Sequence, residues 1–177
     1  DCNACIPVRI PVERFQPDRG QRRVWQRNRD LSVTASAPAY RDEHFELYRR
    51  YQAMRHPGGG MDDMNPGKYL EFLHSDWCKT YFVEFSIGGE LVAVAVVDRA
   101  GKALSAMYTF FDPHFSAYSP GVYAVLWQVN HARHLGLEFV YLGYWIEQCR
   151  KMSYKSRYRP IQALINCEWR QFDKQQI

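Results

Sequence analysis

The chain has 177 residues, of which 46% are hydrophobic and 24% are charged, a composition that supports one sizeable buried core. No apolar run approaches the roughly 20 residues of a membrane span, and no signal-peptide core opens the sequence, which argues against a membrane protein. Five cysteines are an odd number for a disulfide framework, so we expect a reducing, cytoplasmic location; the net charge of +4 is unevenly distributed.

A cysteine pair lies at the start of the chain. Cys2 and Cys5 form a C-x-x-C motif, which is half of a zinc or iron–sulfur site. Any metal would need further cysteines from upstream residues, and reduced thiols without metal are the alternative. We expect residues 1–30 to be a basic, cysteine-bearing remnant of an N-terminal domain, and residues 31–177 to form the following domain.

Arginines dominate the next stretch. Seven arginines stand against two acids between residues 9 and 29. Residues 21–30 have helical character, and Arg22, Arg23 and Arg27 recur at a spacing that places them on neighbouring faces. This helix is either a nucleic-acid-binding face or a solvated one.

A strand and two helices follow. Residues 31–37 alternate and are rich in small and β-branched side chains, which predicts a strand. Residues 41–55 place aromatic and apolar side chains at helical spacing, and the run HPGGG from His56 ends that helix. Residues 66–74 are predicted as a helix with Asn65 as its N-cap.

The rest of the chain predicts an antiparallel meander, a long helix and two further strands. These elements cover residues 81–87, 91–98, 103–111, 119–135, 138–142 and 162–165. Gly88 and Gly89 form the turn of the first hairpin, and Gly136 closes the long helix.

The stretch from Leu142 to Pro160 combines cations with aromatic rings. Its cations are Arg150, Lys151, Lys155, Arg157 and Arg159, and its rings are Tyr144, Trp145, Tyr154 and Tyr158. No acid follows Glu147 in this stretch. Because phosphates bind cations and exposed bases stack on rings, the pattern favours an RNA partner. A basic surface loop with aromatic side chains packed beneath it is the alternative.

This stretch also closely resembles the C-terminal motif of the aminoacyl-tRNA–protein transferases of the N-degron pathway. That motif reads approximately LGY-x-I-x-x-C-x-K-M-x-Y-K-x-x-Y-x-P. The matching positions are Gly143, Tyr144, Ile146, Cys149, Lys151, Met152, Tyr154, Lys155, Tyr158 and Pro160. The tryptophan in LGYWI is typical of the bacterial members of that family.

The resemblance implies an α+β chain with the GNAT-like acyltransferase fold, a mixed, mostly antiparallel, splayed central sheet flanked by helices. The predicted order of elements agrees with that fold. In such a fold the acyl donor lies where the sheet opens, which we expect near residues 107–111, facing residues 142–144.

The loop before the 119–135 helix bears on the identity of the donor. Acetyl-CoA-dependent members of the fold hold the pyrophosphate on repeated glycines at this helix N-terminus. Here the loop FDPHFSAYSPGVYAV contains Gly121 alone, so CoA is the weaker donor hypothesis and an aminoacyl-tRNA suits the sequence better.

Several residues are candidates for the reaction itself. On the strand at 103–111, Ser105 and Tyr108 are expected to point into the opening, and a similar stretch in the family favours a donor contact for Tyr108. Glu147 and Gln148 lie at the turn of the motif, and either is a candidate to orient the attacking amine. The resemblance also suggests His56 as a substrate contact.

Other candidates bind the two substrates. Tyr144, Lys155, Tyr158 and Arg159 are candidates for substrate binding, and an arginine can hold an acidic N-terminal side chain bidentately. The candidates for tRNA binding are Arg22, Arg23, Arg27, Arg150, Lys151 and Arg157. Cys149 is interpreted as a packing residue rather than a nucleophile, because no histidine accompanies it nearby.

The implied reaction is attack of a peptide α-amine on the ester of an aminoacyl-tRNA, which requires positioning and oxyanion stabilisation but no cofactor. Iron–sulfur binding is implied by the resemblance to eukaryotic members. Bacterial members transfer Leu from Leu-tRNA to N-terminal Asp or Glu, which marks the acceptor for degradation, and this is the function we predict. Arginyl transfer, CoA-dependent N-acetylation and noncatalytic RNA binding are the alternatives.

Overall fold

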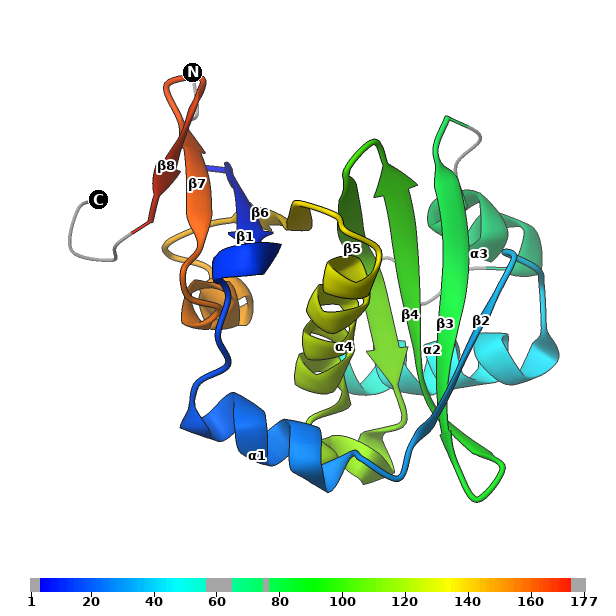
Figure 1. The fold of residues 1–177 in the computed structure, drawn as a ribbon. Helices are drawn as coiled ribbons and strands as arrows, with labels where there is room; N and C mark the ends of the chain where they lie inside the picture. The colour runs from blue at the N-terminus through cyan, green and yellow to red at the C-terminus, as the bar shows by residue number, and fades with distance from the viewer. Residues whose placement is uncertain (1–3, 57–64, 75–76, 173–177) are drawn as a thin grey trace.

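A computed structural model describes residues 4–56, 65–74 and 77–172, which form an eight-stranded sheet with helices on both faces (Figure 1). The strands are β1 (Ile6–Pro11), β2 (Ser32–Ser36), β3 (Lys79–Ile87), β4 (Glu90–Ala100), β5 (Ala103–Phe111), β6 (Phe139–Trp145), β7 (Gln162–Ile165) and β8 (Glu168–Gln171). Their order across the sheet is β2-β3-β4-β5-β6-β1-β7-β8. The α+β class predicted from the sequence is confirmed.

The helices pack on both faces of the sheet. They are α1 (Arg19–Arg27), α2 (Asp42–Arg55), α3 (Pro66–Leu73) and α4 (Pro120–His134), with 3-10 turns η1 (Val12–Arg14), η2 (Pro113–Tyr118) and η3 (Arg150–Arg157). In Figure 1, α4 lies in front of the sheet and α2 behind it. None of the helices in the described part of the chain has the length and apolar character that crossing a membrane requires.

The helix ends follow the signals in the sequence. The Asn65 side chain accepts a hydrogen bond from the Lys68 amide at 3.0 Å and caps α3, as predicted. Asp18 and Gln21 form a reciprocal capping box that starts α1, with Asp18 Oδ1 2.8 Å from the Gln21 amide. The sequence placed the start of α1 two residues too late, because its signal is this box rather than a run of apolar residues.

The sheet opens between β5 and β6. These parallel strands pair at three positions, Ala103–Phe139, Leu104–Val140 and Ser105–Tyr141, and their pairing then ends. The remaining parts of the two strands, residues 106–111 and 142–145, diverge. The predicted opening near residues 107–111 and 142–144 is therefore confirmed.

A bulge lies on each strand where pairing stops. In β5, Val96 of β4 pairs with Tyr108 and Val97 pairs with Ala106, so Met107 is the extra residue. In β6, the register against β1 shifts near Gly143, which adopts a left-handed φ of 71° that favours glycine. Because bulges bend strands and increase their twist, the pair turns β5 and β6 away from each other.

The Met107 bulge also changes which face the rest of β5 presents. Before it, Leu104 and Ala106 pack with the core beneath α4. After it, Tyr108 and Phe110 pack with the core beneath α2 and α3. Regular alternation would put Ser105 and Tyr108 on opposite faces, so the bulge is what places both on the α2 face.

The sequence did not predict β1, which lies inside the sheet. It pairs antiparallel with both β6 and β7, so residues 6–11 are continuous with the sheet formed by residues 31–172. Arg9, at the start of the arginine-rich stretch, lies 3.6 Å from the Phe139 ring centroid and 4.1 Å from that of Trp169. Its Nε donates to Gln162, so this cation stabilises the sheet.

The burial of β1 predicts that Ile10→Ala destabilises the fold. Ile10 is fully buried, so its truncation is expected to lower the free energy of unfolding by about 2–5 kcal/mol. Val33→Ala on the edge strand β2, a half-buried site, serves as the control and should cost less. Urea unfolding followed by circular dichroism measures both variants, and equal losses would contradict an integral β1.

Candidate active site

Three tyrosines gather behind the opening of the sheet, and we call them the tyrosine cluster: Tyr51 of α2, Tyr108 of β5 and Tyr154 of η3. The ring centroids of Tyr51 and Tyr108 lie 6.4 Å apart in an edge-on arrangement. Partial loss of solvent around the hydroxyl raises the pKa of each of the three tyrosines, so all three stay protonated at neutral pH. The cluster therefore offers neutral rings and O–H donors.

The hydroxyl of Tyr108 has a fixed acceptor role. Gln52 Nε2 donates to Tyr108 Oη at 3.0 Å, and Gln52 itself is buried on α2. Since a phenol donates one hydrogen bond, this contact directs the Tyr108 proton to another acceptor. Burial raises the pKa of Tyr108, which keeps that proton in place.

An ion pair between half-exposed Arg50 and buried Asp112 holds α2 against the end of β5. Arg50 Nη2 lies 2.8 Å from Asp112 Oδ2, and His114 donates to Oδ1 of the same carboxylate through its backbone N–H at 2.9 Å. Burial opposes ionisation of Asp112, but the bonds from His114 and Arg50 outweigh it and hold its pKa below the ordinary value. The pair fixes Tyr51, whose ring packs 5.0 Å from that of Phe111.

The 3-10 turn η3 links the two halves of the opened sheet. On the β6 side, Lys155 Nζ donates to the Tyr144 carbonyl at 2.6 Å. On the α2 side, Lys151 Nζ lies 3.3 Å from both the Arg55 carbonyl and His56 Nδ1. The structure thus pairs four predicted residues, Lys155 with Tyr144 and Lys151 with His56.

Burial lowers the pKa of Lys155, although Cys149 partly opposes this shift. The ammonium lies beside Gly143, where an added Cβ would be 3.9 Å from Nζ. A partly buried ammonium with one backbone acceptor retains donors for an anionic group.

Other predicted residues lie at the rim. Ser105 occupies the last β5–β6 pair, at the point where the opening begins. Glu147 and Gln148 are exposed in the turn after β6, and Arg150 is exposed at the start of η3.

Tyr158 lies elsewhere than expected. Its side chain is 1% exposed and packs against Phe15 and Tyr154, and its hydroxyl has no hydrogen-bond partner among the described residues. A ring at this depth does not offer a surface contact, so the structure disagrees with direct substrate binding by Tyr158. Its aromatic character is explained by the core beneath η3.

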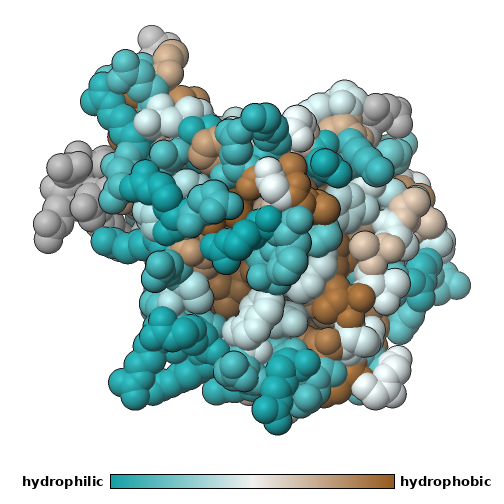
Figure 2. Space-filling model, in the orientation of Figure 1, coloured by the Kyte–Doolittle hydropathy of each residue, from teal (hydrophilic) through white to brown (hydrophobic). Residues whose placement is uncertain are grey.

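The predicted tRNA-binding arginines of α1 lie on the surface. Arg22, Arg23 and Arg27 are exposed, and hydrophilic side chains cover α1 at the lower left of Figure 2. Arg22 Nη1 donates to the Pro17 carbonyl at 2.6 Å, and Arg27 donates to the Ala117 carbonyl. Backbone acceptors orient these guanidiniums without neutralising them.

A cavity of about 410 Å³, which we call the α1–η3 pocket, separates the start of α1 from η3. Its lining residues are Gln16, Asp18, Ser153, Ser156, Arg157 and Arg159. Two predicted cations, Arg157 and Arg159, therefore lie here and not beside Lys155.

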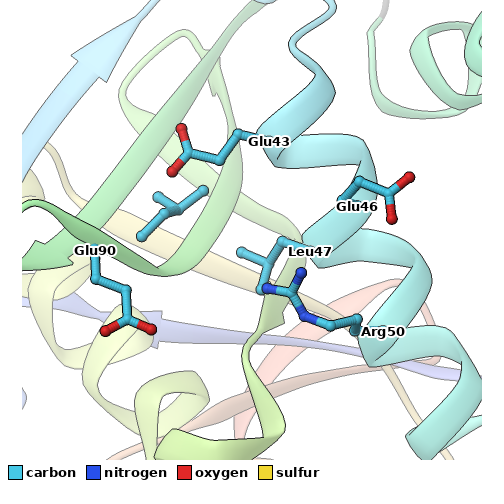
Figure 3. Close-up of a pocket in the computed structure, with 6 residues that line it drawn as sticks. Glu43, Glu46, Leu47, Arg50 and Glu90 are labelled. Atoms are coloured by element: carbon cyan, nitrogen blue, oxygen red, sulfur yellow. The ribbon is translucent and has the colours of Figure 1, made fainter.

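A second cavity, of about 310 Å³, lies between α2 and the start of β4 (Figure 3). Glu43, Glu46 and Glu90 line it together with Arg50. Its net charge is negative, so it is unsuited to a polyanion.

The cysteine motif stays a prediction. Cys2 lies outside the described residues, and Cys5 is exposed with a free thiol. Among the residues that the structure describes, no three His, Cys, Asp or Glu side chains cluster as metal ligands.

The opened sheet and its bulged strands define the GNAT-like fold. The chain superposes on a tandem GNAT protein from the clavulanic acid biosynthesis pathway with a TM-score of 0.52 at 9% identity, over 88% of this chain and 49% of that one. It superposes on the C-terminal domain of a putative lysylphosphatidylglycerol synthetase from Agrobacterium fabrum with a TM-score of 0.61 at 15% identity, over 81% and 47% of the two chains. Such low identities establish the fold alone.

Sequence comparison gives the family. Residues 43–165 match the family described as arginine-tRNA-protein transferase, C terminus. The chain is 52% identical over 168 residues to an aspartate/glutamate leucyltransferase from Chromobacterium violaceum, covering 95% of this chain and 69% of the relative. The chain therefore belongs to the family of arginine-tRNA-protein transferases and aspartate/glutamate leucyltransferases, and it is a transferase.

The sequence missed two residues that shape the site. Tyr51 and Gln52 were assigned to a helix and given no role. A signal was available for Gln52, because it stands four residues after Tyr48 on the buried face of α2, and a polar side chain there needs a partner.

The ion pair of Asp112 predicts a pH dependence of stability. Its folded pKa lies below the unfolded value of about 3.9, so the ionised carboxylate stabilises the native state above about pH 5, and this contribution is lost as the pH falls through the folded pKa. Between about pH 5 and pH 2 the wild type should therefore lose more stability than Asp112→Asn. Urea midpoints across this range test the prediction, with exposed Asp30→Asn as control; parallel curves for all three proteins would refute it.

Proposed function

We propose that this protein transfers leucine from Leu-tRNA to the N-terminal Asp or Glu of acceptor proteins, at the opening between β5 and β6. The observation that carries the proposal is a sheet that opens between β5, which carries Tyr108, and β6, to which Lys155 is bonded, in a chain 52% identical to an aspartate/glutamate leucyltransferase. The proposed donor lies along the tyrosine cluster, where rings suit the terminal adenosine. The proposal places the reaction in the cytoplasm and requires no cofactor.

The chemistry needs few groups. The neutral α-amine of the acceptor attacks the ester carbonyl carbon, a C–N bond forms, and the carbonyl oxygen becomes an oxyanion. The C–O bond to the ribose then breaks, and the proton lost by the amine ends on the departing ribose oxygen. Because the ester is already activated, orientation and oxyanion stabilisation supply the rate enhancement.

Tyr108 is the proposed oxyanion donor. Gln52 occupies its acceptor side at 3.0 Å, and the raised pKa keeps its proton in place, so the phenol is preorganised to donate. Glu147 and Gln148 lie in the exposed turn after β6, where either side chain can accept a hydrogen bond from the incoming amine.

Lys155 is the proposed partner of the acceptor's acidic side chain. Burial disfavours its charged form, and a carboxylate placed beside it would offset that cost. This gives Asp and Glu an advantage over neutral N-terminal residues, whose binding leaves the ammonium unpaired.

A transfer assay tests the proposal. The protein is incubated with radiolabelled Leu-tRNA and matched peptides that begin with Asp, Glu or Ala. Label is expected in the Asp and Glu peptides, and about tenfold less in the Ala peptide, since leaving the partly buried ammonium without an anionic partner costs about 1.4 kcal/mol. Labelling from Arg-tRNA or acetyl-CoA in place of Leu-tRNA would overturn the leucyl assignment.

The role of Tyr108 gives a second prediction. Tyr108→Phe keeps the ring and removes the donor, so kcat should fall by about 10²-fold while KM for the peptide changes little. Tyr40→Phe is the control, because Tyr40 is exposed and donates to Asp42 at the start of α2. An unchanged kcat in Tyr108→Phe would remove this residue from the reaction.

A further inference from the structure

The α1–η3 pocket is positively charged. Arg157 and Arg159 line it directly. Arg22 lies close by, since its Nη1 is 2.6 Å from the carbonyl of Pro17, which stands between two lining residues, Gln16 and Asp18. Asp18 is the one acid among the lining residues, so the charge of the site stays positive.

The acid in the pocket has a structural task. Asp18 Oδ1 accepts a hydrogen bond from the Gln21 amide at 2.8 Å, and Gln21 Oε1 accepts one from the Asp18 amide at 2.9 Å. Gln21 Nε2 also donates to the Arg157 carbonyl at 3.2 Å. The capping box thus ties the start of α1 to the end of η3 and fixes the distance between the walls of the pocket.

The two serines of the pocket do not donate their hydroxyl protons to a ligand. Ser153 Oγ donates to the Arg150 carbonyl and Ser156 Oγ donates to the Ser153 carbonyl, both at 2.9 Å, so their protons are used within η3. The guanidiniums are therefore the groups that attract a ligand, and guanidinium forks suit phosphate and carboxylate oxygens.

The position of the pocket selects between these two anions. Ser153, Ser156 and Arg157 of η3 line the pocket beside the start of α1. Lys151 and Tyr154 of the same turn lie near α2, beside the opening. An acceptor's first side chain is attached to the residue that carries the attacking amine, so it must lie at the opening. The tRNA extends far beyond the ester and can reach the other side of η3.

We propose that the α1–η3 pocket binds a backbone phosphate of the donor tRNA, through Arg157 and Arg159, with Arg22 at its edge. The inference rests on the proposed function and reassigns Arg159 from the acidic acceptor to the nucleic acid. The exposed arginines of α1 continue the same surface away from the opening, as a path for the backbone of the tRNA.

Binding of uncharged tRNA tests the pocket separately from transfer. Fluorescence anisotropy over a series of KCl concentrations compares the wild type with the double variant Arg157→Gln/Arg159→Gln. The variant should bind on the order of tenfold more weakly, and the slope of log affinity against log salt should become shallower by about 1 to 2.

The matched control is Arg49→Gln/Arg170→Gln, which removes two exposed cations that pair with Glu46 and Glu168 away from the pocket. Its tRNA affinity should change much less. An equal loss of tRNA affinity in both double variants would mean that binding depends on net charge alone, and would contradict the proposed phosphate site in the pocket.

A reciprocal variant protects the test against misfolding. Asp18→Asn keeps a capping oxygen but removes the negative charge from the pocket, so it should bind tRNA about two- to fivefold more tightly. Unchanged or weaker binding by this folded variant would contradict the proposal.

Transfer kinetics distinguish failure of the pocket from failure of the function. If the arginine variant binds tRNA normally but shows a raised KM for the Asp peptide, the pocket belongs to the acceptor and the inference fails while leucyl transfer stands. If the wild type binds tRNA with the predicted salt dependence but transfers no leucine, the pocket stands and the proposed function fails.

Discussion

Parallel pairing between β5 and β6 stops after three residue pairs, and the shape of the site follows from that stop. Two bulges enforce it, one at Met107 and one near Gly143. The pairing partners of the flanking strands keep each half of the sheet intact, because β5 stays bonded to β4 and β6 stays bonded to β1. Each strand at the opening therefore keeps one hydrogen-bonded neighbour. The backbone groups on its other edge face the region where we place the substrate.

The same stop separates two kinds of surface. Behind the opening lie the neutral hydroxyls of the tyrosine cluster, and Lys155 is bonded to β6 at its edge, which suits an ester and an acidic amine-bearing residue. On the other side of η3, Arg157 and Arg159 face the start of α1 and suit a phosphate backbone. The two substrates of a transferase differ greatly in length, and one short 3-10 turn that meets α1 through some side chains and α2 through others can serve both.

Local patterns in the sequence were enough for most of the fold, and with the family resemblance for the opening of the sheet. Helical spacing, the Asn65 cap and the glycine turn predicted the helices and the meander, and the family motif located the opening. The sequence did not reveal pairing between distant strands. The strand β1 has no hairpin partner that would mark it, and Arg9 looks like one more cation of a basic run although it contacts β6, β7 and β8 in the structure. The burial of Tyr158 was missed for a similar reason, because spacing does not reveal which side of a 3-10 turn faces the core.

The central claim is that the leucyl ester lies between the diverging ends of β5 and β6. A crystal structure of the protein with a leucyl-adenosine analogue, in which an amide replaces the ester, tests it most directly. The account predicts the leucyl carbonyl oxygen about 3 Å from the Tyr108 hydroxyl, with the adenine along the tyrosine cluster. An analogue bound in the α1–η3 pocket, or on the opposite face of the sheet beneath α4, would contradict it.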